Sequence, residues 1–241
     1  MSLTDLMEEL AQYRREGNEK GVANVAFAVG DYHLRNGNYL ESQQYFKEAL
    51  DICRKHGNRQ GEATSAIGLG EAMLLTEQPR TAFEFFQVAQ NYYVETQDEQ
   101  GLANISRRLG DAFRKLGNSQ EALLQYKQAL EILSKYNDEL GVAELQVQAG
   151  LTAMEMGLVK EALDHFEPAL DFYDRNKVLD KQAFVLAGIG SIMAQQEDRE
   201  KALRFLKASR ELYKKIGLHA SIQALDREIQ TIEAAMAQVS E

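Results

Sequence analysis

Hydrophobic and small residues recur along this chain with a period of forty residues. Glycine marks the period at Gly30, Gly70, Gly110, Gly150 and Gly190, and alanine keeps it at Ala23, Ala63, Ala103, Ala143 and Ala183. A fixed period of about twenty to fifty residues is typical of a solenoid, in which each unit buries its hydrophobic face against its neighbours. The pattern therefore predicts stacked repeats over 21–60, 61–100, 101–140, 141–180 and 181–220.

Each repeat holds two segments with the spacing of a helix. In 101–140, small or hydrophobic residues fall at Ala103, Ser106, Leu109, Gly110 and Phe113, and then at Ala122, Tyr126, Ala129, Leu130 and Leu133. Steps of three and four residues place such side chains on one face of a helix. Leu116-Gly117-Asn118 separates the segments, as expected where a helix ends next to a glycine. Each repeat is therefore predicted to be a helix, a short turn and a second helix.

Three further slots recur in the second half of every repeat. The alanine slot reads Ser42, Ala82, Ala122, Ala162 and Ala202, the aromatic slot reads Phe46, Phe86, Tyr126, Phe166 and Leu206, and the last small slot reads Ala49, Ala89, Ala129, Ala169 and Ser209. With the small-x-x-Leu-Gly motif of the first half, this pattern resembles the tetratricopeptide repeat (TPR). Its length is similar to that of the long-helix variant in cell-polarity adaptors, kinesin light chains and bacterial peptide-sensing regulators. The resemblance implies an all-α fold, a right-handed α-solenoid of helix-turn-helix TPR units.

The two ends of the chain are shorter than a repeat. Residues 1–20 align with 41–60 and are predicted to form one second-type helix. In 221–241, one hydrophobic stripe is formed by Ile222, Leu225, Ile229, Ile232 and Met236, and the other faces are polar. Because terminal repeats need a polar outer face, we interpret 221–241 as a capping helix and 1–241 as a single TPR solenoid. The same spacing over two heptads is also compatible with a coiled-coil dimer, so a homo-oligomer is an alternative.

The two prolines occupy different positions in the repeat. Pro168 lies inside the predicted second helix of 141–180, where it cannot donate a hydrogen bond to the carbonyl of Asp164, so we expect a bent helix. Pro79 lies at the turn before a second helix, where a proline in the first turn is tolerated.

Composition and charge argue against several classes of protein. No hydrophobic run reaches the eighteen or so residues of a membrane span, and the first residues carry acids where a signal peptide needs basic residues. Cys53 is the only cysteine, so no intrachain disulfide can form and a cytoplasmic localisation is expected. The net charge of −10 would repel nucleic acid over most of the surface. The basic stripe Lys201, Arg204, Lys207, Arg210 and Lys214 is interpreted as a solvated convex face.

The sequence offers little catalytic chemistry. None of His33, His56, His165 and His219 has partners at the spacing of a metal site, and His33 occupies a packing slot held by Met73 and Phe113 in later repeats. Cys53 is interpreted as a buried, unreactive thiol, and the glycines sit at helix contacts and helix ends instead of in a phosphate-binding loop. We therefore expect no enzyme activity, no metal and no cofactor.

The resemblance implies that the first helix of each repeat lines a concave surface that binds extended or helical peptides. Carried over by position, the peptide-binding residues of this groove are Asn24, Phe27, Asp31, Leu34, Ile67, Glu71, Leu74, Leu75, Asn104, Arg107, Asp111, Arg114, Lys115, Val147, Leu151, Met154 and Phe184. Such a surface would have a partly cationic centre between two hydrophobic flanks, which is typical of a binding site. The alternative is that long helices bury Leu34, Leu74 and Met154 in the core.

Two hypotheses concern acidic ligands. In TPR co-chaperones a lysine, asparagine and arginine clamp holds acidic chaperone tails, but the matching slots here read Phe27, Asp31, Gly68, Asn104 and Arg108, so that clamp is not expected. Arg107 and Arg114 lie two turns apart on one helix face and are predicted to receive a carboxylate of the partner. The alternative is that both arginines form ion pairs with Asp111.

The sequence thus predicts a protein-protein interaction scaffold or adaptor that binds a peptide or helix of a partner, with an acidic group and hydrophobic anchors. Two alternatives are a peptide-responsive regulatory sensor domain and a scaffold that assembles end to end through its N-terminal edge. Neither nucleic acid nor a membrane is expected as a partner.

Overall fold

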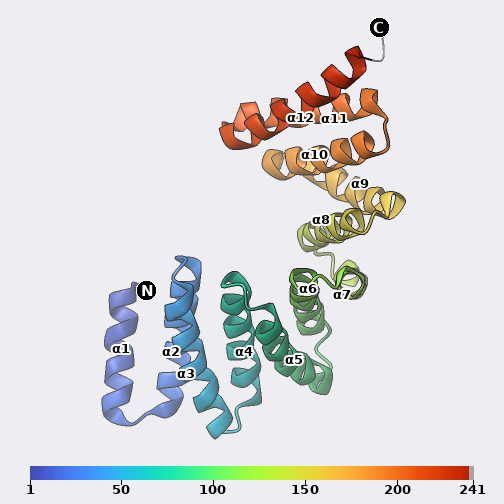
Figure 1. Cartoon of the computed structure of the whole chain (residues 1–241). Coiled ribbons are helices and arrows are strands. Elements are labelled where there is room, and N and C mark those ends of the chain that lie inside the picture. Colours follow the sequence, from blue (N-terminus) through green and yellow to red (C-terminus); the bar gives the residue numbers. More distant parts are fainter. Residues whose placement is uncertain (239–241) are drawn as a thin grey trace. The chain divides into compact units, whose positions relative to one another are not determined.

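The structure is a computed structural model that describes residues 1–238, and the described residues form twelve α-helices joined by short turns (Figure 1). The helices are α1 (Leu3–Glu16), α2 (Glu19–Arg35), α3 (Tyr39–Lys55), α4 (Arg59–Leu75), α5 (Pro79–Thr96), α6 (Glu99–Lys115), α7 (Ser119–Lys135), α8 (Glu139–Glu155), α9 (Val159–Arg175), α10 (Leu179–Gln195), α11 (Arg199–Ile216) and α12 (His219–Ala237). The predicted all-α class is confirmed. The capping segment 221–241 falls largely in α12, and residues 239–241 lie outside the described residues.

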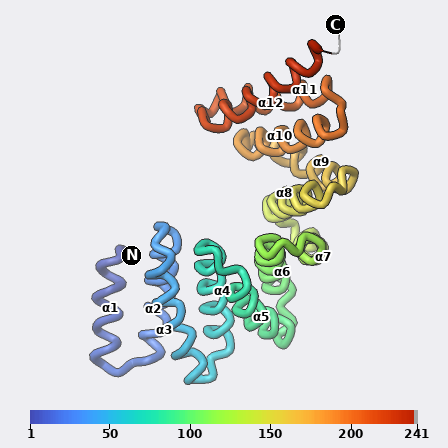
Figure 2. The backbone as a smooth tube through the Cα atoms, in the orientation of Figure 1, coloured from blue at the N-terminus to red at the C-terminus, as the bar shows by residue number. Residues whose placement is uncertain are grey.

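The chain divides into two compact units, Met1–Ile132 and Leu133–Glu241. In the first unit each helix from α1 to α6 packs on the next, and α4 also contacts both α2 and α6. In the second unit α8 to α12 pack in the same consecutive way, and α8 also contacts α10. Figure 2 shows the chain reversing direction at the turn between one helix and the next. This nearest-neighbour packing is that of the predicted α-solenoid. That both units form a single solenoid over 1–241 stays a prediction.

Close contact between a glycine and a large side chain joins the two helices of each repeat. A Cβ atom added to the recurring glycine would lie 2.9 Å from Phe46 at Gly30, 2.5 Å from Phe86 at Gly70, 2.5 Å from Tyr126 at Gly110, 2.7 Å from Phe166 at Gly150 and 2.7 Å from Leu206 at Gly190. These separations are shorter than real Cβ contacts, so only glycine lets the partner side chain lie against the backbone. All five partner side chains are fully buried. The recurring glycines thus mark the positions where the two helices of a repeat are in close contact.

Several of the first helices begin with a side-chain cap. Asn18, Asn58, Asp98 and Asp138 accept hydrogen bonds of 2.9–3.0 Å from the backbone N–H groups of Gly21, Gly61, Gly101 and Gly141. These bonds satisfy donors that have no partner within the helix. Pro79 is the first residue of α5, where its missing N–H costs no helical bond. Pro168 lies inside α9, which continues through it to Arg175.

Turns that follow the helices use a left-handed backbone residue. Gly17, Gly37, Gly57, Gly117, Gly157 and Gly217 take this conformation, and so do Glu77, Gln97, Asn137, Lys177 and Glu197, with φ between 55° and 61°. Glycine adopts it without strain, whereas a side chain brings Cβ close to a carbonyl oxygen. The turns without glycine are therefore strained positions.

We predict that Gly110→Leu destabilises the first unit by about 1–3 kcal/mol, because the new side chain must displace the ring of Tyr126. A thermal melt followed by circular dichroism measures the loss. Gln100→Leu, at an exposed position of the same helix, controls for adding leucine to α6. A Gly110→Leu melt that superimposes on wild type would contradict the close contact.

We also predict that Gln97→Gly raises the free energy of unfolding by about 0.5–1 kcal/mol, because it relieves strain at a φ of 55°. The reciprocal change, Gly57→Gln at a φ of 66°, should lower it by a similar amount. Urea titrations of both variants and of wild type provide the measurement. Opposite signs are required, and a loss of stability in both would show that backbone strain does not govern these turns.

Candidate functional site: a hollow across three first helices

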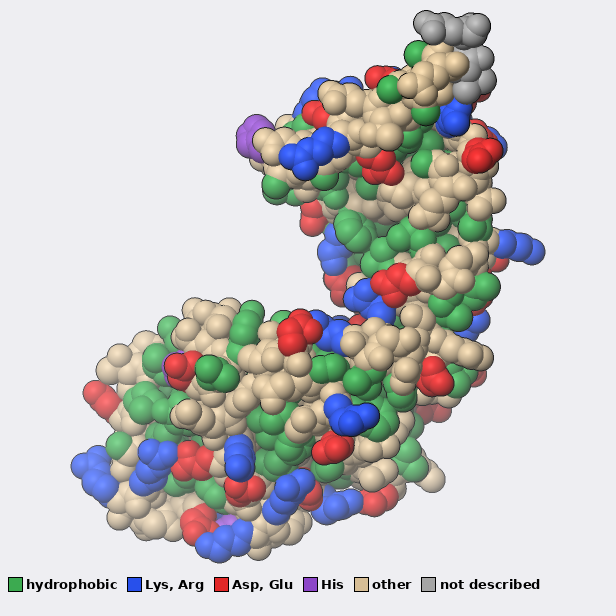
Figure 3. All heavy atoms as spheres, viewed as in Figure 1, with side chains coloured by type: hydrophobic (Ala, Val, Ile, Leu, Met, Phe, Trp, Pro, Cys, Tyr) green, Lys and Arg blue, Asp and Glu red, His purple; other side chains and the backbone are tan. Residues whose placement is uncertain are grey.

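The first unit carries an open hollow of about 320 Å³ on the side formed by its first helices. Its lining residues come from α2, α4 and α6, with one residue each from α3 and α5, and they are Phe27, Asp31, Leu34, Phe46, Thr64, Ile67, Gly68, Glu71, Tyr93, Asn104 and Arg108. Because α4 contacts both α2 and α6, three consecutive repeats contribute to one surface. Figure 3 shows hydrophobic, acidic and basic side chains interspersed on the visible face of this unit.

The floor of the hollow is hydrophobic because α4 carries a glycine where it crosses the ring of Phe46. A Cβ at Gly68 would lie 2.6 Å from that ring, so no side chain can stand there without moving it. Phe27 packs on the same ring, with centroids 5.3 Å apart and planes at 55°. Phe27, Leu34 and Ile67 are only partly buried and present hydrophobic surface to the hollow.

The walls carry charged groups in two unlike ion pairs. The Nε atom of Arg108 lies 2.5 Å from Oε1 of Glu71, and its Nη1 atom donates to the carbonyl oxygen of Asn104 at 3.1 Å. The side chains of this pair are 18% and 31% exposed. Asp31 instead pairs with Arg35, one turn along α2, at 2.9 Å, and the Arg35 side chain is 77% exposed. The first pair joins two helices through a largely buried guanidinium, whereas the second lies within α2 and has an exposed guanidinium.

The structure brings together about half of the groove residues predicted for this unit. Phe27, Asp31, Leu34, Ile67, Glu71 and Asn104 all line the hollow. Gly68 and Arg108, which the sequence comparison with the chaperone clamp had singled out, line it as well. Tyr93 was missed because it belongs to a second helix, and its ring packs against Gly101 at the start of α6. That contact recurs between Tyr13 and Gly21, so the pairing of a ring with a glycine eight residues later is the signal that could have found it.

Asn24, Leu74 and Leu75 lie outside the lining of the hollow. Leu74 is 8% exposed and packs in the core with Phe86, so its assignment to the groove is corrected to core. Leu75, the next residue, is 51% exposed at the end of α4, and Asn24 is exposed on α2.

The predicted cationic centre on α6 is largely occupied by neighbouring acids. Arg108 pairs with Glu71, and Lys115 Nζ lies 2.7 Å from Glu77 Oε1. Arg107 forms no ion pair or hydrogen bond with any residue in the described part of the chain. The cluster therefore differs from the cationic centre expected from the sequence, because two of its basic side chains pair with acids of other helices or turns.

Asp111 has a hydrogen-bond partner on α7. Its Oδ1 atom accepts a hydrogen bond of 2.6 Å from the hydroxyl of Tyr126. Burial, and then the charge of Asp111, raise the pKa of this tyrosine, so the hydroxyl stays protonated and donates. Within the described residues no ion pair joins Asp111 to Arg107, so the alternative in which both arginines pair with Asp111 is wrong for Arg107.

The second unit places its four predicted groove residues in different environments. Val147 is 7% exposed and belongs to the core around Phe166, a correction to its predicted place in the groove. Leu151 and Met154 are partly buried against the same core. Phe184 is 46% exposed on α10. The basic stripe of α11 is mostly paired with acids, as shown by the ion pairs Lys201–Asp198, Lys207–Glu233, Arg210–Asp226 and Lys214–Glu211.

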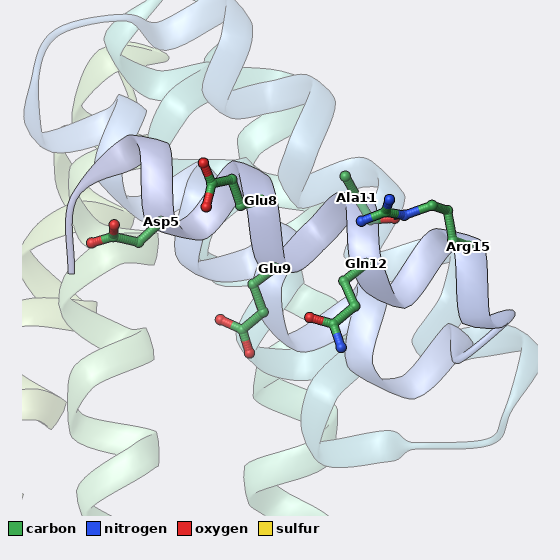
Figure 4. A pocket seen from close by; sticks show the side chains of 6 residues that line it. All are labelled: Asp5, Glu8, Glu9, Ala11, Gln12 and Arg15. Atoms are coloured by element: carbon green, nitrogen blue, oxygen red, sulfur yellow. The ribbon is translucent and has the colours of Figure 1, made fainter.

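The N-terminal edge has a charged surface. Figure 4 shows a shallow hollow on α1 whose lining residues all belong to this one helix, namely Asp5, Glu8, Glu9, Ala11, Gln12 and Arg15.

Other reactive groups are held in packing or in ion pairs. Among the described residues, no three metal-ligating side chains come together, and no helix has the length and hydrophobicity to cross a bilayer. His33 stacks on Tyr45 with centroids 5.6 Å apart, as its packing slot predicted. Cys53 is buried as a free thiol, and this burial raises its pKa.

Comparison with known protein families identifies the type of repeat. A family model described as "Tetratricopeptide repeat" matches residues 21–95 and 141–215, and a second model of the same description matches 108–134. Among curated protein sequences, none matches this chain.

Three solved structures illustrate the similarity of fold. BtubC (BKLC) from P. vanneervenii is 16% identical, with 89% of this chain and 91% of that chain covered and a TM-score of 0.76. YrrB, described as "a TPR protein with an unusual peptide-binding site", is 21% identical, with 88% and 96% covered and a TM-score of 0.60. A Rap protein complexed with competence and sporulation factor is 13% identical, with 98% and 72% covered and a TM-score of 0.64.

We predict that Cys53 reacts with a thiol reagent such as Ellman's reagent at least about a hundredfold more slowly in the native protein than in urea, since it is 5% exposed and its thiolate is disfavoured. Absorbance of the released thiolate follows the reaction. Native and unfolded rates within a factor of two would contradict the buried, unreactive thiol.

Proposed function

We propose that this chain, which belongs to the tetratricopeptide repeat family, is a protein-interaction scaffold that binds an extended segment of a partner protein in the hollow of its first unit. The observation that carries the proposal is the assembly of Phe27, Ile67 and Leu34 from two repeats over the ring of Phe46. Partly exposed hydrophobic side chains in a concave site are the usual anchors for a ligand. We infer no catalytic activity, and a cytoplasmic setting that suits the single free thiol.

The size of the hollow suits side chains better than a whole helix. A volume of about 320 Å³ lies at the lower end of the range of ligand pockets and accommodates one or two large side chains. The polar groups of Thr64 and Asn104 also line it and can hydrogen-bond a peptide backbone. A segment in extended conformation would insert an anchor residue and continue along the neighbouring first helices.

An acidic group of the partner, expected from the sequence, has one clear receptor in this unit. Arg107 makes no ion pair among the described residues, whereas Arg108 and Lys115 pair with Glu71 and Glu77 and Arg114 has a contact of its own. We therefore propose Arg107 as the contact for a carboxylate, in place of the Arg107 and Arg114 pair. Such a contact would lie beyond the lining of the hollow.

A regulatory sensor is the second candidate. The similarity to the Rap protein complexed with competence and sporulation factor extends over 98% of this chain. In that role the bound peptide would change the affinity for another partner, which requires two sites coupled by a conformational change. The hollow would then be the peptide site, so the experiment below applies to both roles.

We predict that dodecapeptides selected from a random displayed library bind wild type and lose about tenfold in affinity to Ile67→Ala, because hydrophobic anchors dominate such interfaces. Fluorescence anisotropy with a labelled peptide measures the affinity, and circular dichroism checks the fold. Leu40→Ala is the matched control, since Leu40 is 64% exposed on α3 and lies outside the hollow. A library that yields no binder, or binders equally tight to Ile67→Ala, would overturn the assignment of the hollow.

A further inference from the structure

We infer that the segment bound in the hollow carries a basic side chain next to its hydrophobic anchor, and that Asp31 receives it. This inference rests on the proposed function of the hollow and adds the chemistry of the partner. Among the described residues, the hollow is lined by two carboxylates, Asp31 and Glu71, and by one guanidinium, Arg108. The choice between an acidic and a basic ligand depends on which of these three groups is free to change partners.

The Glu71–Arg108 pair is not free to change partners. Arg108 makes two contacts, to the Glu71 carboxylate at 2.5 Å and to the Asn104 carbonyl at 3.1 Å. The Arg108 side chain is largely withdrawn from water and Glu71 is partly so, so opening the pair would leave a largely desolvated guanidinium without its partner. A ligand carboxylate would have to displace Glu71 from Arg108 while Glu71 stayed beside it as a like charge. The guanidinium is therefore a poor receptor for an acidic segment.

Asp31 can exchange its partner at little cost. Its ion pair with Arg35 spans one helical turn, and the side chains of the pair are 37% and 77% exposed for Asp31 and Arg35. Pairs of this kind contribute little because solvent screens them. A lysine or arginine of the partner would replace Arg35 at Asp31, and Arg35 would return to water. Phe27 lies one turn before Asp31 on α2 and also lines the hollow, so the anchor and the basic side chain would be neighbours.

The surrounding charge favours the same ligand. The repeat 61–100, which supplies the centre of the hollow, contains seven acidic residues and one arginine, and the whole chain carries −10. Such a field attracts a basic segment over long range and repels an acidic one. The contact at Asp31 would convert this general attraction into a preference for one position in the segment.

The test begins with the same random dodecapeptide library, selected in parallel on wild type and on Asp31→Lys. Peptides selected on wild type should carry Lys or Arg within two residues of a large hydrophobic residue, and those selected on Asp31→Lys should lose this bias. Glu41→Lys, an exposed α3 residue outside the hollow, makes the same change in net charge and should leave the bias unchanged.

Individual affinities sharpen the result. A peptide selected on the wild-type protein should bind Asp31→Lys about tenfold more weakly than wild type in low salt. It should bind Glu41→Lys within about twofold of wild type. Arg35→Gln, which removes the competing cation, should strengthen binding by about twofold to threefold. Replacing the basic residue of the peptide with Glu should restore binding to Asp31→Lys.

Failure of this inference is distinguishable from failure of the hollow. Peptides that depend on Ile67 but show no basic residue, or that bind Asp31→Lys and Glu41→Lys equally, would overturn the role of Asp31 and leave the hollow in place. Selected peptides with an acidic residue, and no basic one, next to the hydrophobic anchor would overturn it as well. Peptides insensitive to Ile67→Ala would overturn both.

Discussion

Each repeat depends on the seating of a large side chain against the backbone of a glycine in the partner helix. At the five recurring glycines an added Cβ would lie only 2.5–2.9 Å from that side chain. The alanine slot and the last small slot of each repeat hold small, buried residues, so the paired helices can approach each other closely. This spacing sets the position of each first helix on its second helix. Stacked neighbours then present their first helices on a common side, which is where the hollow of the first unit lies.

Function in such a fold resides in the positions that the repeat leaves free. Four of the five aromatic-slot residues are hydrophobic without a hydroxyl, whereas Tyr126 adds a hydrogen bond to Asp111. The slot of Gly68 is filled by Arg108 one repeat later, and this single exchange provides both the hydrophobic floor and the charged wall of the hollow. The hollow therefore depends on residues that differ between repeats, whereas the packing of the helices depends on residues that recur.

The sequence predicted the arrangement of the helices well because the residues that pack the helices together recur every forty positions. The glycine and aromatic slots and the helix pairs all follow from that period. It predicted the candidate site less well, because positions within one helical turn differ in whether their side chains face the core or the surface. Leu74 and Val147 share the spacing of groove residues yet turn into the core.

Ion pairs were harder still to foresee. Pairing of Glu71 with Arg108 connects different repeats, and spacing along one helix carries no information on such contacts. The basic residues of α6 therefore looked like one cationic centre, although Arg108 pairs with Glu71 and Lys115 with Glu77. The ring of Tyr93 reaches the hollow from a second helix, a direction that the list of first-helix positions could not include.

The central claim is that the first helices of consecutive repeats form one site for a hydrophobic side chain. A crystal structure of the chain bound to a selected dodecapeptide tests it most directly. The account predicts a hydrophobic peptide side chain within about 4 Å of both Phe27 and Ile67, over the ring of Phe46. A peptide bound elsewhere on the chain, with these three side chains uncovered, would contradict it.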